Sequence, residues 1–368
     1  AESYAKTQSY NSSVGECATF AYTTALNYLL ADSEHVKIIG DTTVVYWAKT
    51  AEAEFQDLVN SELLGDEDSE FSEEDLKGAM RELAKGHTYD MNGFILNPKT
   101  EFYILGLSPN AARLSVRFFY RNTFGSLMKN LEEHYERMEI VRPSFDNAER
   151  LSIWKLLNET VNPKSKDKSA SPLLAGALAM SILNNQRYPA VLMNAIMLRI
   201  RAEQNVNRAR AGIIKAFLLK NSSNKYIREA LTMELNEQCD YMPYVLGRLF
   251  SVLEEIQEVA NPGLNATIKD RFFNSASSTP AIIFPQILNL KNNHIKVLRR
   301  EKFGYAVNLE KKVQELLSLI HESFPKHLNI EDQGTFNIGY YHQTQKRFEK
   351  KIKENNKNEN TIENNKED

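Results

Sequence analysis

The segment from Phe102 to Phe124 constrains the fold most, because it predicts a β-hairpin. An apolar, aromatic run (Phe102–Leu107) is followed by a Ser-Pro-Asn break at 108–110 and by a second run, Leu114–Tyr120. Two β-prone runs around such a break are typical of a hairpin. Helical spacing resumes directly afterwards, so we expect the α+β fold class.

Three arginines, Arg113, Arg117 and Arg121, follow the second strand of this hairpin at intervals of four residues. In a regular strand an even spacing places all three side chains on one face. A row of guanidinium groups can pair with the oxygens of a phosphate backbone. A solvated outer strand would carry the same residues, and the row alone favours that second interpretation.

Shorter elements are expected around the hairpin. Cys17–Leu30 has helical spacing, and Val44–Trp47 is β-branched and aromatic, which indicates a strand. Ser72 fits the N-cap of a helix that reaches Leu83 and stops at Gly86. The stretch 51–75 contains acids but no Lys or Arg, and it predicts a loop with a solvated helix.

The pattern changes after residues 158–171, which are polar, lysine-rich and flanked by prolines. This segment is the best linker candidate. Residues 1–157 before it form the expected α+β part. Apolar stripes at helical spacing after it predict an antiparallel helical bundle over residues 172–345. The tail, 346–368, is rich in Lys, Glu and Asn and is expected to be disordered.

The net charge of −3 hides an uneven distribution. Residues 172–302 contain 17 basic and 10 acidic residues, and a surplus of this kind indicates a polyanionic partner. The candidate contact residues in the first basic group lie around Gln204, with one more on a later helix: Arg199, Arg201, Arg208, Arg210, Lys215 and Arg248.

A second group follows Pro262 and Gly263, which break a helix. Asn265 is expected to cap the next helix, and Lys269 and Arg271 follow it. Helix N-termini with amide and guanidinium donors bind phosphate well. A helix–turn–helix junction with ordinary caps explains the same residues equally well.

Motifs of catalytic and metal sites are absent from the sequence. It has no GxGxxG, no GxxxxGK[ST] and no HExxH, and its seven histidines are scattered. Its two cysteines, Cys17 and Cys239, lie far apart, which fits a reducing cytoplasm better than a disulfide framework or a zinc site. Asp41, beside two threonines, could serve a metal-dependent nuclease, but a turn is the expected role. No apolar run is long enough for a membrane span. We therefore expect no enzyme, cofactor, metal or membrane partner.

Long segments in collinear order resemble the large subunit of the type I-C CRISPR surveillance complex, Cascade. The resemblance spans nearly the whole chain except the tail, although the N-terminal region of the family is expected to be missing. The segments that carry it are Thr19–Asp32, Ile39–Ala48, Ile104–Gly125, Asn207–Leu219, Leu246–Pro285 and Gly339–Gln343.

The resemblance implies a non-catalytic subunit of an antiviral, crRNA-guided complex that binds DNA. Base pairing to the guide reads the sequence in such complexes, while protein supports the displaced strand. The helical part resembles the small subunit of the complex, and its basic surplus would hold the non-target strand through salt-dependent contacts. The implied partners are crRNA, target DNA, the backbone and small subunits, and the helicase–nuclease effector. A protein–protein scaffold without direct DNA contact remains the alternative.

Overall fold

The computed structural model describes residues 14–39, 42–50, 54–61, 72–91, 93–111, 113–146, 148, 150–165 and 170–364. The chain divides into two compact units. Residues 1–129 with 171–176 form the first unit, and residues 130–170 with 177–368 form the second. The division falls inside a helix, α4 (Phe124–Met138), rather than at the predicted linker. Residues 166–169 of that linker lie outside the described residues, and the linker remains a prediction.

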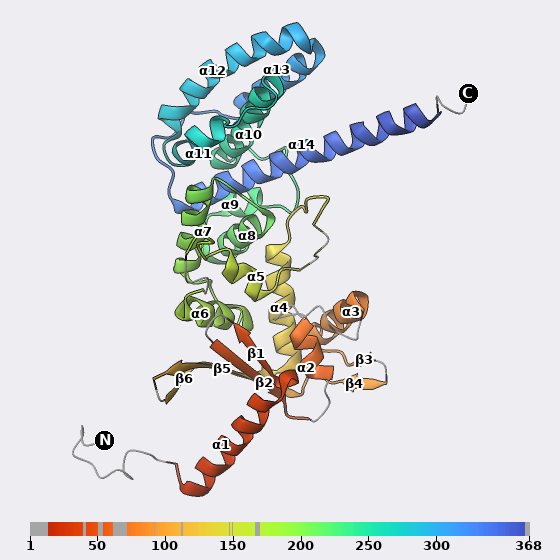
Figure 1. The fold of residues 1–368 in the computed structure, drawn as a ribbon, viewed down its shortest axis with the longest axis vertical. Coiled ribbons are helices and arrows are strands. Elements are labelled where there is room, and N and C mark those ends of the chain that lie inside the picture. The colour runs from red at the N-terminus through yellow and green to blue at the C-terminus, as the bar shows by residue number, and fades with distance from the viewer. Residues whose placement is uncertain are drawn as a thin grey trace, which may run out of the picture. The chain divides into compact units, whose positions relative to one another are not determined.

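The first unit contains a four-stranded antiparallel sheet with the order β1-β2-β5-β6 (Figure 1). The hairpin predicted from the sequence is confirmed as β5 and β6, and the predicted strand at 44–47 lies within β2. Strand β5 continues through residues 108–110, where the sequence had predicted the turn. The chain therefore turns one residue later, at Ala111, where φ is +52°. The elements of this unit are α1 (Glu16–Ala31), a 3₁₀ turn (Ser33–His35), β1 (Val36–Ile39), β2 (Thr42–Ala48), α2 (Glu54–Val59), α3 (Glu73–Ala84), β3 (Tyr89–Met91), β4 (Phe94–Leu96), β5 (Glu101–Asn110), β6 (Arg113–Thr123) and the start of α4.

Two helices of this unit agree with the sequence predictions. The helix expected at residues 17–30 is α1, and the helix expected after Ser72 is α3. The Ser72 hydroxyl accepts a hydrogen bond from the Asp75 amide at 3.2 Å, as an N-cap should. Gly86, with φ +86°, follows the end of α3, where the left-handed backbone favours glycine.

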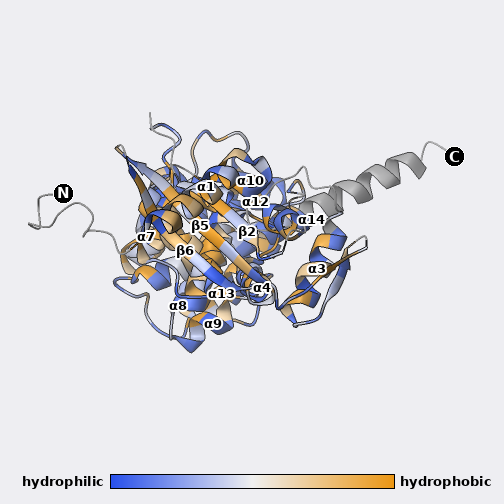
Figure 2. Ribbon diagram, turned by 90° about the horizontal axis from the view of Figure 1, so that it is seen from below, coloured by the Kyte–Doolittle hydropathy of each residue, from blue (hydrophilic) through white to orange (hydrophobic). Residues whose placement is uncertain are grey.

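The two faces of the sheet differ because side chains alternate along each strand. One face is core: the rings of Phe102 and Phe55 pack on Phe124, with centroids 5.2 and 4.6 Å from it. The opposite face carries half-buried and exposed aromatic side chains, among them Tyr103 and Phe119. Figure 2 shows hydrophobic and hydrophilic residues mixed along these strands.

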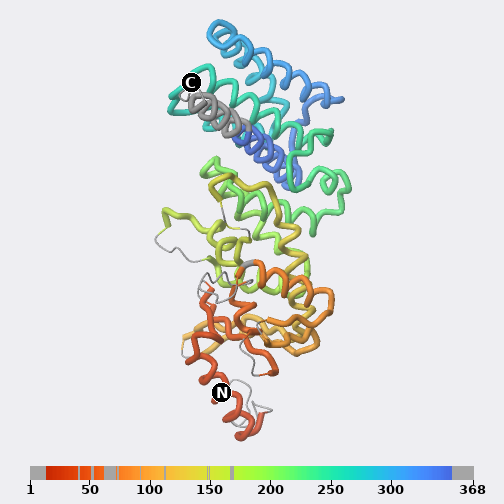
Figure 3. The backbone as a smooth tube through the Cα atoms, turned by 90° about the vertical axis from the view of Figure 1, so that its right-hand side faces the viewer, coloured from red at the N-terminus to blue at the C-terminus, as the bar shows by residue number. Residues whose placement is uncertain are grey.

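The second unit is helical, and it confirms the α+β fold class together with the sheet. The apolar stripes predicted within residues 172–345 fall at 173–183, 191–200, 213–218, 245–256, 284–290 and 307–320, and they correspond to α6, α7, α8, α10, α12 and α13. Figure 3 shows the later helices as the cyan to blue part of the tube. The helices after α4 are α5 (Ile153–Asn158), α6 (Pro172–Leu183), α7 (Ala190–Glu203), α8 (Arg208–Asn221), α9 (Lys225–Ala230), α10 (Met242–Ala260), α11 (Ile268–Ser278), α12 (Pro280–Glu301), α13 (Phe303–Ser318) and α14 (Ile330–Asn364).

The core of the second unit forms where α10 and α14 pack against each other. Their backbones approach so closely that a Cβ at Gly247 would overlap the carbonyl oxygen of Phe336. The ring of Phe273, from α11, lies 5.0 Å from that of Tyr340 and 5.5 Å from that of Phe250. These edge-to-face aromatic contacts join three helices, and such pairs add stability beyond the area that they bury.

Helix α14 begins inside the predicted bundle without an apolar stripe of its own, and it extends to residue 364, through most of the tail expected to be disordered. Its buried face is polar as well as apolar, with Thr335, Asn337 and His342 at 1 % exposure or less. The Nδ1 atom of His342 lies 2.8 Å from the Tyr244 hydroxyl, which satisfies one polar group inside the core. Because these buried side chains are polar, the helix has no continuous apolar stripe to predict it.

Candidate nucleic-acid interface

The structure brings together the two basic segments predicted in the second half of the chain. The end of α7 packs on α11: Gln204 Nε2 donates to the Asp270 carbonyl at 2.7 Å. Asn274 Nδ2 donates to the Arg201 carbonyl at 3.0 Å. The Arg201 guanidinium is exposed and donates to Gln333 Oε1 at 2.6 Å. Residues far apart in the sequence therefore share one region of the helical unit.

Several of the predicted contact residues are buried against acids. Arg208 pairs with Asp146 at 3.0 Å, and Arg210 pairs with Glu159 at 2.6 Å and with Glu203. Arg199 also pairs with Glu203, which lies one helical turn further along α7. These three arginine residues are between 5 and 8 % exposed. A buried cation paired with an acid does not reach a phosphate in solution, so the prediction that these three arginines contact nucleic acid is corrected: they neutralise acids inside the second unit.

Lys215 and Arg248 are buried too, and they donate to oxygens within the second unit. The Lys215 ammonium donates to the Glu139 carbonyl. The Arg248 guanidinium donates to the carbonyls of Asn236 and Glu237, each at 3.2 Å, and to Gln343 Oε1. Burial lowers the pKa of both groups, because the charged form is less stable out of water. Both are structural in this arrangement.

The α10–α11 junction keeps two of its three predicted donors exposed but is capped by another residue. Thr267, not Asn265, is the N-cap of α11, and Thr267 and Asp270 form a capping box. Asn265 and Arg271 are exposed, while Lys269 is half-buried with its ammonium 5.2 Å from the centre of the Tyr340 ring. The junction therefore contains an ordinary helix cap, and it also places the Arg271 guanidinium at the surface.

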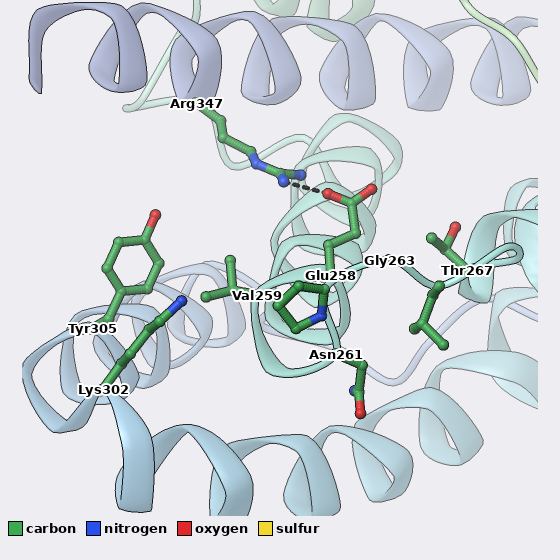
Figure 4. A pocket seen from close by; sticks show the side chains of 10 residues that line it. Glu258, Val259, Asn261, Gly263, Thr267, Lys302, Tyr305 and Arg347 are labelled. Atoms are coloured by element: carbon green, nitrogen blue, oxygen red, sulfur yellow. Dashed lines mark hydrogen bonds and ion pairs between the residues drawn. The ribbon is translucent and has the colours of Figure 1, made fainter. Parts of the chain in front are cut away.

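The same junction lines a cavity of about 540 Å³ (Figure 4). In the figure the Arg347 side chain of α14 points toward Glu258 of α10, and the two form an ion pair. Arg347 also approaches Glu255 at 3.8 Å. Tyr305 of α13 and Lys302, the residue before that helix, also line the cavity. Because the Arg347 guanidinium is paired with Glu255 and Glu258, the cavity is not strongly basic.

A further basic surface lies on α12, outside the two basic groups predicted from the sequence. Residues 271–300 contain five basic residues and no Asp or Glu. In α12 the exposed side chains at helical spacing change from amides to cations toward the C-terminal end. This amide-to-basic stripe consists of Gln286, Asn289, Asn293, Lys296 and Arg300.

The stripe adjoins α11 through a shallow cavity of about 320 Å³. Arg271 and Phe272 line it from α11, and Gln286, Asn289 and Asn293 line it from α12. The Arg271 guanidinium lies 5.1 Å from the centre of the Phe272 ring. The long run without acids is the sequence signal that could have identified this surface.

In the first unit the three hairpin arginines do not share one face, which corrects the prediction. A register shift between Gly106 and Leu107 leaves Arg117 without a partner in the ladder, as in a β-bulge. Arg121 pairs with Tyr103 on one side of the shift, and Arg113 pairs with Asn110 on the other. Because the shift changes the alternation by one residue, Arg113 and Arg121 lie on opposite faces.

Among the described residues, no group of three or more His, Cys, Asp or Glu side chains could hold a metal ion. Asp41 and the acidic residues 66–68 lie outside the described residues. None of the helices described here is both long enough and apolar enough to cross a membrane.

An antiparallel sheet followed by an array of helices, one of which carries an exposed amide-to-basic stripe, defines an α+β protein. The family model described as CRISPR-associated protein (Cas_Csd1) matches residues 1–348, so the chain belongs to this family. Its members are Cascade-type subunits. The comparison with curated proteins found no match.

Proposed function

We propose that the chain is the non-catalytic large subunit of a type I-C, crRNA-guided DNA-surveillance complex. Its helical unit supports the displaced non-target strand. Its partners are crRNA, target DNA, the backbone and small subunits, and the helicase–nuclease effector. Membership of the Cas_Csd1 family supports the assignment to a CRISPR-associated complex.

The observation that carries the strand-holding role is the acid-free run 271–300 with its exposed amide-to-basic stripe. Cations spaced along a surface neutralise phosphates and release counterions, which gives affinity without sequence preference. Amides and the Phe272 ring beside Arg271 supply hydrogen-bonding and stacking groups for unpaired bases. A displaced strand presents both its phosphates and its bases, so this surface fits it.

The contact residues in this proposal are the exposed or half-buried cations of α7, α11 and α12, with Asn265 beside them. They replace the buried arginines of the sequence prediction. The set is Arg201, Asn265, Lys269, Arg271, Lys291, Lys296, Arg299 and Arg300. Arg299 also pairs with Glu310 at 2.6 Å, so it contributes less than Lys296 and Arg300.

The test is single-stranded DNA binding by the full chain, measured as a function of salt. A triple variant, R271Q/K296Q/R300Q, removes three exposed cations from the stripe and its neighbour. The logarithmic slope of affinity against salt should then decrease by about 2, as expected for three lost phosphate contacts. The matched control, K225Q/K311Q/K326Q, removes three exposed lysines elsewhere in the helical unit and should retain the slope.

Equal losses in both triple variants would contradict a localised strand site. Salt-independent binding by the unsubstituted chain would contradict it as well. If the stripe variant binds DNA normally but fails to assemble with partner subunits, the helical unit is a protein–protein scaffold instead.

A further inference from the structure

Three aromatic side chains from neighbouring strands stack in a row on the outer face of the sheet. Trp47 of β2 pairs in register with Tyr103 of β5, and their ring centroids lie 5.2 Å apart with planes within 7°. Phe119 of β6 continues the row, with its centroid 6.4 Å from that of Tyr103 and an interplanar angle of 28°. We name Trp47, Tyr103 and Phe119 the aromatic ladder.

The ladder lies on the face opposite the core of the first unit. Trp47 and Tyr103 are half-buried, whereas Phe119 is 49 % exposed. Phe119 lies on β6, the edge strand of the sheet, so the ladder ends in an accessible ring. Leu114 and Val116 of the same strand are exposed on the same face. A stack of half-buried rings that ends in an exposed one, beside further exposed apolar side chains, is typical of a binding surface rather than of solvated strands.

Cations flank the ladder. Arg121 pairs in register with Tyr103, and its guanidinium lies 5.7 Å from the centre of that ring. Arg121 and Lys49 both contact Glu101, at 2.7 and 2.9 Å, and their side chains are 59 % and 68 % exposed. Two cations share one carboxylate, so the charge beside the ladder is positive. Exposed ion pairs of this kind are weak, and a phosphate can compete for the cations.

Proteins recognise single-stranded nucleic acids by combining aromatic rings, on which bases stack, with cations that contact the phosphates. We propose that the aromatic ladder binds unpaired nucleobases of a single-stranded nucleic acid, with the adjacent phosphates on Arg121 and Lys49. A protein partner on the edge strand would use Leu114 and Val116 and would not need the cations. The ladder belongs to the first unit, so this site is separate from the strand-holding surface of the helical unit.

The experiment isolates the ladder by using the full chain with the R271Q/K296Q/R300Q background, in which the helical surface is weakened. The probes are oligouridine RNA and oligothymidine DNA of about 12 nucleotides, which is within the usual site size for single-strand binding. Each carries photoreactive 4-thio bases. Cross-links should map to peptides that contain Trp47, Tyr103 or Phe119. Preference for RNA would assign the ladder to the guide, and preference for DNA to a target strand; either result supports the shared chemistry.

A variant pair measures the contribution of the ring. F119A should weaken binding by about 5- to 150-fold, the loss expected for one base–aromatic stack, and F119W should retain it. L114A is the matched control, because Leu114 is an exposed apolar residue on the same strand and face. It should leave the affinity unchanged.

A second readout uses the intrinsic fluorescence of the ladder. The chain has two tryptophans, Trp47 and Trp154, so W154F leaves Trp47 as the sole reporter. Addition of either oligonucleotide should quench it. Absence of both cross-links and quenching would overturn the proposal, whatever the helical unit binds. Equal weakening by L114A and F119A would also overturn it and would identify an apolar protein-docking edge instead.

Discussion

Gly339 of α14 lies directly against the backbone of Tyr244 in α10, so closely that a Cβ at Gly339 would overlap the Tyr244 carbonyl oxygen. Gly247 makes the reciprocal approach to Phe336. Two glycines facing backbone atoms allow these helices to approach more closely than any side chain at those positions would permit. The segment Gly339–Gln343, which the sequence analysis identified only through its resemblance to a family, therefore packs α14 against α10.

The first prediction concerns this helix crossing. Gly339→Ala should destabilise the protein by about 1–3 kcal/mol or more, because the new methyl group meets backbone atoms that cannot move aside. Gly304→Ala is the control: Gly304 is exposed near the start of α13, and a Cβ there meets nothing within 4 Å. Alanine should be neutral or slightly stabilising at that position. Urea unfolding measures both, and equal stabilities for the two variants would contradict the close approach.

The second prediction separates stability from nucleic-acid binding. Arg210→Ala should lower the free energy of unfolding by about 1–3 kcal/mol, because Glu159 loses its charged hydrogen-bond partner while Glu203 keeps its ion pair with Arg199. Arg271→Ala, at an exposed position, should leave stability within about 0.5 kcal/mol and weaken single-stranded DNA binding. Thermal or urea unfolding measures the stability of both variants, and DNA titrations measure their affinity for single-stranded DNA. An unaltered stability in Arg210→Ala would show that the buried pair is dispensable.

The third prediction concerns acid sensitivity. Burial lowers the pKa of His134 and of His342 to about 3, from an ordinary value of about 6.5 for histidine. Below pH 6.5 the unfolded chain binds protons that the folded chain excludes, so the unfolding free energy falls as the pH decreases toward 3. Each histidine contributes up to about 1.4 kcal/mol per pH unit.

His342→Gln should therefore make the stability less dependent on pH between about 6.5 and 5, a window above the range of most carboxylates. His321→Gln, at an exposed position, provides the control. Urea unfolding at several pH values gives the slope. The same slope in His342→Gln and in the unsubstituted chain would contradict a neutral, buried His342.

The fourth prediction concerns the helix that carries Lys269 and Arg271. Thr267→Ala removes the cap of α11 and should cost about 1 kcal/mol. Asn265→Ala should cost much less, because Asn265 is exposed and does not cap the helix. If Asn265→Ala is the more destabilising change, the cap lies where the sequence placed it and not at Thr267.

Local signals were sufficient where neighbouring residues determine the structure. The hairpin at 102–123 and the cap at Ser72 depend on nearby turn and capping residues, and both were predicted correctly. The bulge at Arg117 depends on how two strands pair, which no single strand reveals. Helix α14 escaped prediction because its buried residues, such as Asn337 and His342, are polar.

The surface predictions depended on partners that lie elsewhere in the chain. Glu203 lies four residues after Arg199, a spacing that could have indicated their ion pair. Asp146 and Glu159, which pair with Arg208 and Arg210, are about 50–60 residues away, and only the fold brings them near. Counting charges therefore located a basic region but did not identify which of its cations face solvent.

The position of α14 has a consequence for biosynthesis. The helices that α14 contacts, α8, α9, α10 and α11, leave the ribosome before α14 is translated. Until it arrives, Phe250 and Phe273 lack Phe336 and Tyr340, and the glycine-lined backbone of α10 has nothing against it. The helical unit consequently completes its core only after residues 330–343 have been synthesised, and until then its nascent helices are a natural substrate for chaperones that hold exposed apolar surfaces.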